Sequence, residues 1–262
     1  MMNTFETLAV TRDDAGVVSV ALARPEKRNA MSGKMIAELT QFAATVSADS
    51  SMRAVILSGQ GDVFCAGADL GWMQQQIEAD RDQRMREARK LADMLFALNT
   101  LPQPVIGRVH GGAFGGGVGL CSVCDVVIAA QGTKFAFTET RLGLIPATIS
   151  PYVLAKMGER NARHVFMSSR VFPADQAMTL GLVSDVVEPD QLDQRIGDEI
   201  KPYLSVAPGA VAASKALARS LGPRIDAAVI DDTITRLADT WETEEAAHGI
   251  ASFLGKTKPR WA

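Results

Sequence analysis

Residues 111–120 read GGAFGGGVGL, and six of the first nine positions are glycine. Glycine inside a helix or strand costs about 0.5–1 kcal/mol relative to alanine, so this cluster indicates a place where bare backbone is needed. The residues from Val118 onward, VGLCSVCD, predict a short buried helix. The amides of Gly115, Gly116 and Gly117 are therefore expected at a helix N-terminus, where free N–H groups and the helix dipole attract negative charge.

Several interpretations of this glycine run are open. The spacing does not fit a dinucleotide-binding fingerprint, and a P-loop is excluded because no Lys-Ser or Lys-Thr pair follows. The glycines serve either close helix packing alone or an oxyanion hole, which needs a second backbone donor. A second glycine turn, CAGADL at residues 65–70, also lies between a strand end and a helix start. Placed beside the first turn, it would supply that donor.

Strands and helices alternate over the first part of the chain. The predicted strands are residues 5–12, 17–24, 53–59, 105–111, 126–130 and 183–188, and the predicted helices before residue 150 are 33–48, 82–99 and 118–125. From about residue 150 the pattern is helical, with three helices after the last strand. This order predicts an α/β fold with a helical C-terminal part.

The composition is that of an ordinary globular protein. The chain has 262 residues, 47% hydrophobic and 22% charged, with a formal net charge of −3. The slight acidity argues against nucleic acid or an anionic membrane as the main partner, and no apolar run reaches the roughly 18 residues of a membrane span. The basic segment at residues 81–90 is interleaved with acids, which favours a solvated helix face with i,i+4 ion pairs over RNA binding.

The number and spacing of cysteines and histidines indicate a reducing compartment and predict no metal site in the protein. Three cysteines suit core packing better than a disulfide framework, and the three histidines are scattered. The N-terminal residues are unlike a signal or transit peptide. We therefore expect a cytoplasmic protein with no bound metal.

Four motifs in order resemble the crotonase (enoyl-CoA hydratase/isomerase) superfamily. They are RPEKRNAM at 24–31, FCAGADL at 64–70, the run GGAFGGG followed by a Cys-Asp pair, and ETRLGLIP at 139–146. The resemblance covers most of the chain. It implies a spiral of ββα units over residues 1–195 and a C-terminal helical domain over 196–262, which serves in oligomerisation and covers the active site. It also implies homotrimers or hexamers and an acyl-CoA thioester substrate, with coenzyme A as part of the substrate and no permanently bound cofactor.

The resemblance also implies the site residues. The oxyanion donors would be the backbone amides of Ala68 and Gly116. Residues expected near the substrate or its CoA portion are Lys27, Asn29, Ala66, Asp69, Leu70, Gly115, Gly119, Arg141 and Lys256. Ala66, Lys27 and Asn29 would approach the adenine and phosphates, and Lys256 would reach the CoA of a neighbouring subunit.

One catalytic group of the family pattern is missing. Many hydratases of the superfamily use two glutamates; Glu139 matches the second, but Gly119 stands at the position of the first. A carboxylate in a largely apolar pocket has a pKa raised toward neutrality, which suits a group that both removes and delivers a proton. Glu139 is therefore the candidate acid/base.

Three functions fit a single glutamate. The stretch ETRLGLIPATISPYVLAKMG at 139–158 resembles hydratases of the 3-methylglutaconyl-CoA and isohexenylglutaconyl-CoA type, whose branched substrate has a tertiary C–O bond that breaks readily. A Δ3,Δ2-enoyl-CoA isomerase needs only one base. A CoA- or RNA-binding relative without catalysis is the third. We favour the hydratase, with Arg141 pairing with a distal substrate carboxylate, orienting Glu139 or lying on the surface.

Overall fold

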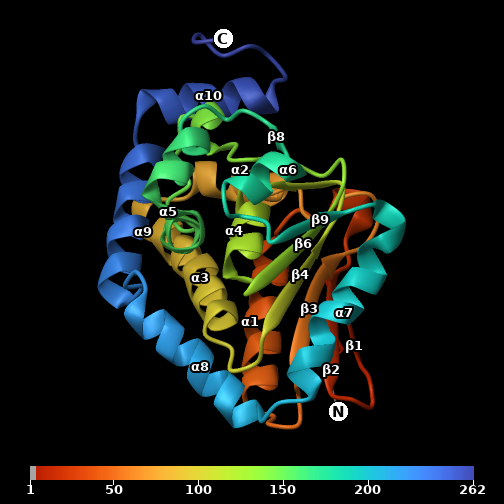
Figure 1. Cartoon of the computed structure of the whole chain (residues 1–262). Helices are drawn as coiled ribbons and strands as arrows, with labels where there is room; N and C mark the ends of the chain where they lie inside the picture. The colour runs from red at the N-terminus through yellow and green to blue at the C-terminus, as the bar shows by residue number, and fades with distance from the viewer. Residues whose placement is uncertain (1–3) are drawn as a thin grey trace.

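The computed structural model describes residues 4–262, and the predicted N-terminal hairpin forms the edge of its larger sheet (Figure 1). The order of this six-stranded sheet is β1-β2-β3-β4-β6-β9, with β1 antiparallel to β2 and all other neighbours parallel. Its strands are β1 (Leu8–Arg12), β2 (Val17–Leu22), β3 (Ala54–Gly59), β4 (Val105–Val109), β6 (Val126–Ala130) and β9 (Asp185–Val187). The predicted α/β class is confirmed.

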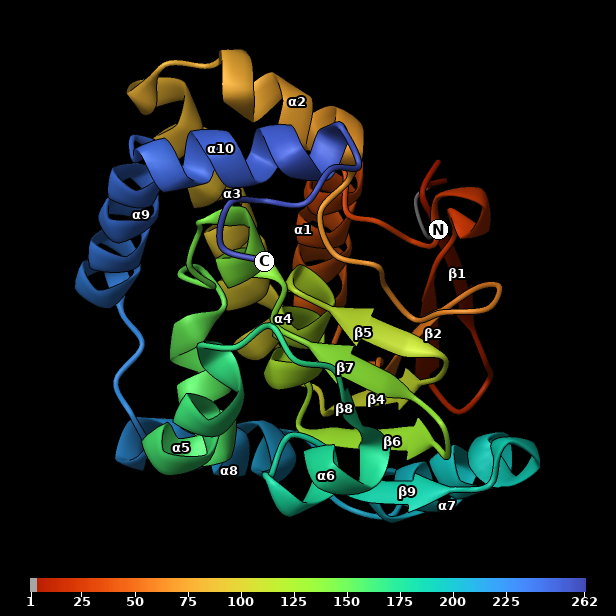
Figure 2. The ribbon, with the colours of Figure 1, turned by 90° about the horizontal axis from the view of Figure 1, so that it is seen from above.

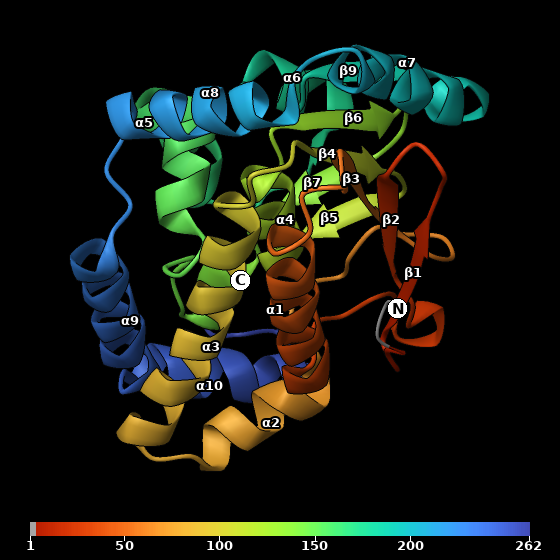
Figure 3. The ribbon, with the colours of Figure 1, turned by 90° about the horizontal axis from the view of Figure 1, so that it is seen from below.

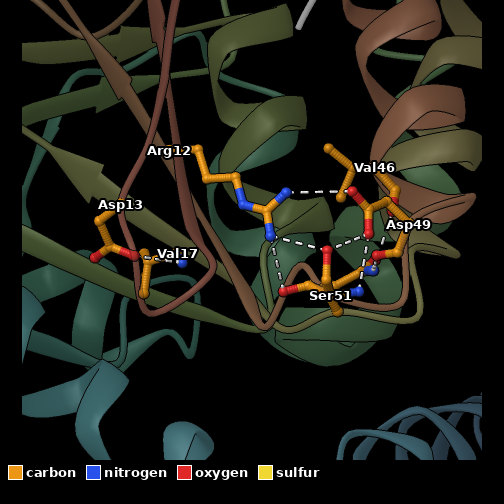
Figure 4. A network of polar contacts seen from close by, with 7 residues as sticks. Arg12, Asp13, Val17, Val46, Asp49 and Ser51 are labelled. Atoms are coloured by element: carbon orange, nitrogen blue, oxygen red, sulfur yellow. Dashed lines mark hydrogen bonds and ion pairs between the residues drawn. The ribbon is translucent and has the colours of Figure 1, made fainter. Parts of the chain in front are cut away.

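Polar contacts fix the hairpin and tie it to the end of the first helix (Figure 4). The Asp13 carboxylate accepts from the amide of Val17 across the turn at 2.8 Å. At the end of β1, the Arg12 guanidinium pairs with the Asp49 carboxylate at 3.3 Å and donates to the Ser51 hydroxyl at 2.8 Å. The turn leading into β3 is thereby held against the sheet edge.

A second sheet of three strands carries the site. It contains β5 (Gly112–Phe114), β7 (Lys134–Ala136) and β8 (Phe172–Pro173), with β5 parallel to β7 and β7 antiparallel to β8. In each of the pairs β4/β5 and β6/β7, the first strand belongs to the larger sheet and the second to the smaller one. A helix follows each pair, α4 after β5 and α5 after β7. These are the ββα units of the expected spiral. Sequence analysis missed β5, since glycine has low strand propensity and hid a strand inside the glycine run.

Ten helices surround the two sheets in the described chain. They are α1 (Gly33–Ser47), α2 (Leu70–Glu78), α3 (Arg81–Asn99), α4 (Gly116–Val123), α5 (Ser150–Phe166), α6 (Ala174–Thr179), α7 (Leu192–Leu204), α8 (Pro208–Leu221), α9 (Ala227–Trp241) and α10 (Glu244–Leu254). The prediction of three helices after the last strand is wrong. Four are present, because only Glu242 and Thr243 separate α9 from α10, and the Thr243 hydroxyl caps the start of α10 by accepting from the amide of Ala246.

The main core lies between the larger sheet and helices α1, α3 and α4 (Figure 1). The opposite face of this sheet packs on α7 through Leu192, Ile196 and Ile200. Helix α7 runs across the predicted domain boundary at 195/196, so the division into two domains stays a prediction. All three cysteines are free and buried, which confirms their packing in the core.

Helices α2, α9 and α10 gather at one end of the molecule, away from α7 (Figures 2 and 3). Helix α9 packs on α3 through ion pairs: Arg81 contacts Asp239 and Glu242 at 2.7 Å each, and Arg89 contacts Asp231. The expected pairing within the helix is also present, as Arg89 pairs with Asp93 (i,i+4) and Lys90 with Glu87 (i,i+3), so the basic segment at residues 81–90 makes ion pairs both within α3 and to the chain of α9.

Candidate active site

The two glycine turns lie side by side, as predicted. Residue Cys65 forms a parallel bridge with Ala113 at the free edge of β5. Its amide donates to the carbonyl of Gly112 at 3.1 Å, and its own carbonyl accepts from the amide of Phe114 at 3.0 Å. The turn at residues 65–70 is thereby fixed against the start of α4.

Within residues 4–262, the amides of Ala68 and Gly116 donate to no backbone acceptor. The same holds for their neighbours Gly67 and Gly117, but of these four residues only Ala68 and Gly116 line the same cavity. A Cβ atom added at Gly116 would overlap the terminal methyl group of Met31, so a larger residue there would require this flexible side chain to move. The amide that precedes α4 is used differently, since Gly115 donates to the carbonyl of Ala136 at 2.9 Å. This arrangement presents two unpaired donors to the cavity, as an oxyanion hole requires.

The cavity has a volume of about 410 Å³ and predominantly apolar walls. Its lining comes from the two turns, from the segment 136–149 and from α2, α3, α9 and α10. The apolar side chains that line it include Met31, Trp72, Met73, Leu91, Phe114, Leu142, Leu144, Ile145, Ile149, Val171, Leu237, Trp241 and Phe253. Such a concave, mostly apolar site with a few polar groups is typical of a small-molecule pocket.

Glu139 is the one carboxylate that lines this cavity in the described part of the chain. It begins a 3-10 turn at Glu139–Leu142, directly after β7. Its Oε2 atom is enclosed and has no hydrogen-bond partner, and its Oε1 atom lies 3.0 Å from where a Cβ of Gly115 would be. Burial raises the pKa of Glu139 to about 7, against smaller opposing effects of nearby backbone N–H groups. The carboxylate therefore lies beside the oxyanion turn and is ready to exchange a proton near neutral pH.

No side chain can enter the cavity from position 119. A Cβ atom added at Gly119 would overlap Cγ2 of Ile149 and lie 3.1 Å from its Cβ. Ile149 is 2% exposed and lines the cavity. The place from which a second glutamate would reach the substrate is thus occupied by an aliphatic side chain.

Other predicted site residues are divided between the cavity and its supports. Ala66, Gly115 and Arg141 line the cavity together with Ala68, Gly116 and Glu139. Asp69 lies outside its lining. The Asp69 carboxylate caps α2 by accepting from the amides of Gly71 and Trp72, and it pairs with Arg24 at 3.0 Å. Asp69 therefore fixes the turn that presents Ala68.

Asn29 also supports the site from outside the cavity. It is fully buried, and its amide nitrogen donates to the carbonyls of Gln60 at 2.7 Å and Val63 at 2.9 Å. Its side-chain oxygen accepts from the amide of Arg24 at 3.0 Å. The expectation that the Asn29 side chain approaches CoA is not met, because these hydrogen bonds hold it inside the loop.

Lys27, Leu70 and Lys256 are exposed and do not line the cavity. Their contacts with CoA stay predictions.

Two tryptophans of the cavity wall are held by one face of α3, which sequence reasoning missed. Trp72 of α2 donates its indole N–H to the carboxylate of Glu87 at 3.4 Å. The guanidinium of Arg84 lies 5.4 Å from the ring centre of Trp241 on α9, and its Nε donates to the carbonyl of Gln76 at 2.8 Å. Periodicity marks Trp241 only as part of an amphipathic helix. No signal in the sequence shows that it faces the same cavity as Trp72.

Nothing else in the described chain suggests a metal or membrane site. Residues 4–262 hold no group of three His, Cys, Asp or Glu side chains placed to bind a metal ion. None of the helices in this range combines the length and apolarity needed to cross a bilayer.

Comparison with known proteins extends over nearly the whole chain. A family pattern described as enoyl-CoA hydratase/isomerase matches residues 12–262. The chain is 30% identical to the short-chain-enoyl-CoA hydratase of Clostridium acetobutylicum over 256 residues, 95% of each protein. It is 34% identical to the mitochondrial Delta(3,5)-Delta(2,4)-dienoyl-CoA isomerase of Mus musculus over 196 residues, 71% of this chain and 60% of that relative. The crystal structure of an enoyl-CoA hydratase from Shewanella pealeana superposes with a TM-score of 0.81 at 36% identity, covering 98% of this chain and 96% of that one.

Proposed function

The chain belongs to the enoyl-CoA hydratase/isomerase family, and from this premise we propose that it adds water reversibly to the double bond of a 2-enoyl-CoA. The proposed acyl group is branched at C3 and of the glutaconyl type. The proposal rests on the position of Glu139. Among the described residues it is the one carboxylate that lines the cavity, and it lies beside the amides of Ala68 and Gly116, which have no backbone acceptor.

The two amides act on the thioester oxygen. As water adds at C3, the electrons of the C2–C3 double bond move to C2 and on to the thioester carbonyl, which becomes an enolate. The amides of Ala68 and Gly116 donate hydrogen bonds to that oxygen. The loss of one such donor typically costs about 2.7–4 kcal/mol of transition-state stabilisation.

Glu139 handles both proton transfers. In its ionised form it takes a proton from the water whose oxygen bonds to C3. It then returns this proton to C2, which restores the thioester carbonyl and regenerates the carboxylate. The net result is the addition of one water with one acid/base group, and a pKa near 7 makes both steps accessible at neutral pH.

A branched acyl group fits a site with one carboxylate. In the reverse reaction the hydroxyl leaves from a tertiary carbon, so its C–O bond breaks with less help from a second acid. Arg141 lines the cavity and forms no ion pair with any residue from 4 to 262. Its guanidinium is available for the distal carboxylate of a glutaconyl group.

A second candidate is the isomerisation of a 3-enoyl-CoA to a 2-enoyl-CoA. It is favoured by the apolar wall at Ile149, because moving a proton between C2 and C4 requires one base and no bound water. Glu139 would remove the C2 proton and deliver it to C4, with the same enolate held by the two amides. The isomerase named among the relatives agrees with this alternative.

One experiment separates the two reactions. The purified protein is incubated with 3-methylglutaconyl-CoA and, separately, with a straight-chain 3-enoyl-CoA, and the products are analysed by mass spectrometry and chromatography. We expect the branched substrate to gain the mass of one water. Conversion of the 3-enoyl-CoA to its 2-isomer, with no hydration of the branched substrate, would replace the hydratase by the isomerase.

The proposed assembly is a homotrimer or hexamer, in which Lys256 of one subunit contacts the CoA of another. The exposed position of Lys256, outside the cavity of its own chain, supports this role. Light scattering coupled to size-exclusion chromatography measures the mass. A stable monomer with full activity would contradict the proposal.

A further inference from the structure

Ile149 separates Gly119 from the substrate cavity. It stands at the N-terminal cap of α5, is 2% exposed, and packs against α4 on one side while it lines the cavity on the other. Gly119 lies fully buried on α4. The two positions are thirty residues apart, and their contact depends on the packing of the two helices.

The contact leaves no room for any side chain at position 119. Besides Ile149, the nearest atom to an added Cβ is Cδ2 of Leu95 on α3, at 3.8 Å. A glutamate placed on Gly119 would therefore have to displace the side chain of Ile149 before its carboxylate reached the cavity. Ile149→Ala removes the overlapping Cγ2 atom and opens a path from position 119 to the cavity, while the Cβ of residue 149 stays 3.1 Å from the added Cβ, a contact that a small shift relieves.

We propose that Ile149 is a specificity-determining residue that, packed on Gly119, excludes a second acid/base and restricts hydration to acyl groups branched at C3. This inference rests on the proposed hydratase function. A straight-chain substrate such as crotonyl-CoA carries only one carbon substituent on C3 besides C2, so the C–O bond of its hydrated product is secondary and its cleavage requires more help from a second carboxylate. Because Ile149 packs on Gly119, no second carboxylate reaches the substrate from position 119. The branched substrate reacts with Glu139 as the one acid/base.

The test uses two double variants that differ in one charge. Gly119→Glu/Ile149→Ala restores a carboxylate with space to reach the cavity, and Gly119→Gln/Ile149→Ala fills the same space with a neutral amide. The readout is kcat/KM for the hydration of crotonyl-CoA and of 3-methylglutaconyl-CoA. We expect the glutamate variant to exceed the glutamine control on crotonyl-CoA by about 100-fold, the lower range of general acid–base catalysis. We also expect this gain to depend on pH, and the single variant Gly119→Glu to show none of it.

A stability measurement keeps the inference falsifiable if a double variant is inactive. Gly119→Ala introduces only a methyl group, which meets Ile149 in the wild-type background. We expect it to lower the Tm there and to lower it by less than half as much in the Ile149→Ala background. Equal shifts in the two backgrounds would show that Ile149 does not fill position 119, and the inference would fail.

Two further outcomes separate this inference from the proposed function. In the first, the wild type hydrates 3-methylglutaconyl-CoA, but the glutamate and glutamine double variants hydrate crotonyl-CoA equally slowly. This result overturns the role of Ile149 and leaves the proposed function standing. A wild-type enzyme that hydrates neither thioester overturns the proposed function and the inference with it.

Discussion

Replacing Glu139 by glutamine should stabilise the folded protein, and the gain should depend on pH. Burial raises the pKa of this carboxyl from 4.5 to about 7, so the folded state binds its proton more tightly than the unfolded state does. As pH rises from about 4.5 through 7, the unfolded chain loses this proton first, and the free energy of unfolding falls. A difference of about 2.5 pKa units at 1.36 kcal/mol each sets an upper limit of roughly 3.4 kcal/mol.

Urea denaturation of the wild type and Glu139→Gln at pH 5 and pH 8 measures this effect. Protein concentration is held constant, because assembly shifts the apparent stability. We expect the free energy of unfolding of the variant relative to the wild type to increase by about 2–3 kcal/mol between the two pH values. If the glutamine side chain packs less well than the glutamate, the free energy of unfolding of the variant changes by the same amount at pH 5 and at pH 8. The difference between the two pH values therefore reports only the ionisation of Glu139.

Glu38 supplies a control of opposite sign. Burial acts to raise its pKa, but hydrogen bonds from the Thr7 hydroxyl and from the amides of Glu6 and Thr7 make the net shift a lowering. Its stabilising contribution is therefore present at neutral pH and is lost as pH falls through the folded-state pKa. We expect Glu38→Gln to be destabilising by about the same amount at pH 5 and pH 8, which both lie above 4.5, and to become less destabilising as pH falls below about 4.5. If Glu139→Gln showed no pH-dependent gain, the account of a buried carboxyl with a raised pKa would be refuted.

Three other substitutions test the supports of the site. Asn29→Ala removes three hydrogen bonds to backbone groups, one buried and two partly buried, and should lower the free energy of unfolding by about 3 kcal/mol, measured by urea denaturation. A loss below about 1 kcal/mol would contradict the role of this network. Gly67→Ala places a side chain at φ +95° and 3.0 Å from the carbonyl oxygen of Phe114, which should lower the free energy of unfolding by about 1–3 kcal/mol. It should also lower kcat, because the neighbouring amide of Ala68 moves. An unchanged kcat would argue against the Ala68 amide as an oxyanion donor. Asp69→Ala removes the cap of α2 and the ion pair with Arg24, so we expect a lower Tm and a loss of about 1–2 kcal/mol, whereas an unchanged Tm would show that the cap is dispensable.

Much of the fold and the outline of the site could be predicted from the sequence, because they depend on local patterns. Alternating apolar residues identified the hairpin and the parallel strands, and the two glycine turns marked the ends of two strands in one sheet system. The strands and turns need only neighbours in the chain for their prediction. Glu139 was identified by the resemblance to the superfamily, and its raised pKa was expected from the apolar pocket that this resemblance implies.

Apart from the two glycine turns, contacts between residues distant in the sequence could not be predicted. The close packing of Ile149 on Gly119 depends on how α4 packs against α5, and the place of Trp241 in the cavity wall depends on the packing of α9 on α3. Asn29 illustrates the opposite error. Its place in a family motif suggested a position near CoA, whereas its side-chain amide donates to two backbone carbonyls inside the protein.

The central claim is that Glu139 is the acid/base of a site with one carboxylate. The rate of proton transfer at C2 tests this claim most directly. Hydration of 3-methylglutaconyl-CoA is run in deuterium oxide, and deuterium at C2 of the product is followed by NMR for the wild type and for Glu139→Gln. Thioester binding is measured separately. We predict that the wild type incorporates one deuterium at C2, with a kcat/KM that rises with pH through about 7. The variant should bind the thioester but incorporate deuterium about 10²–10⁴ times more slowly. Deuterium incorporation by Glu139→Gln at the wild-type rate would contradict the account.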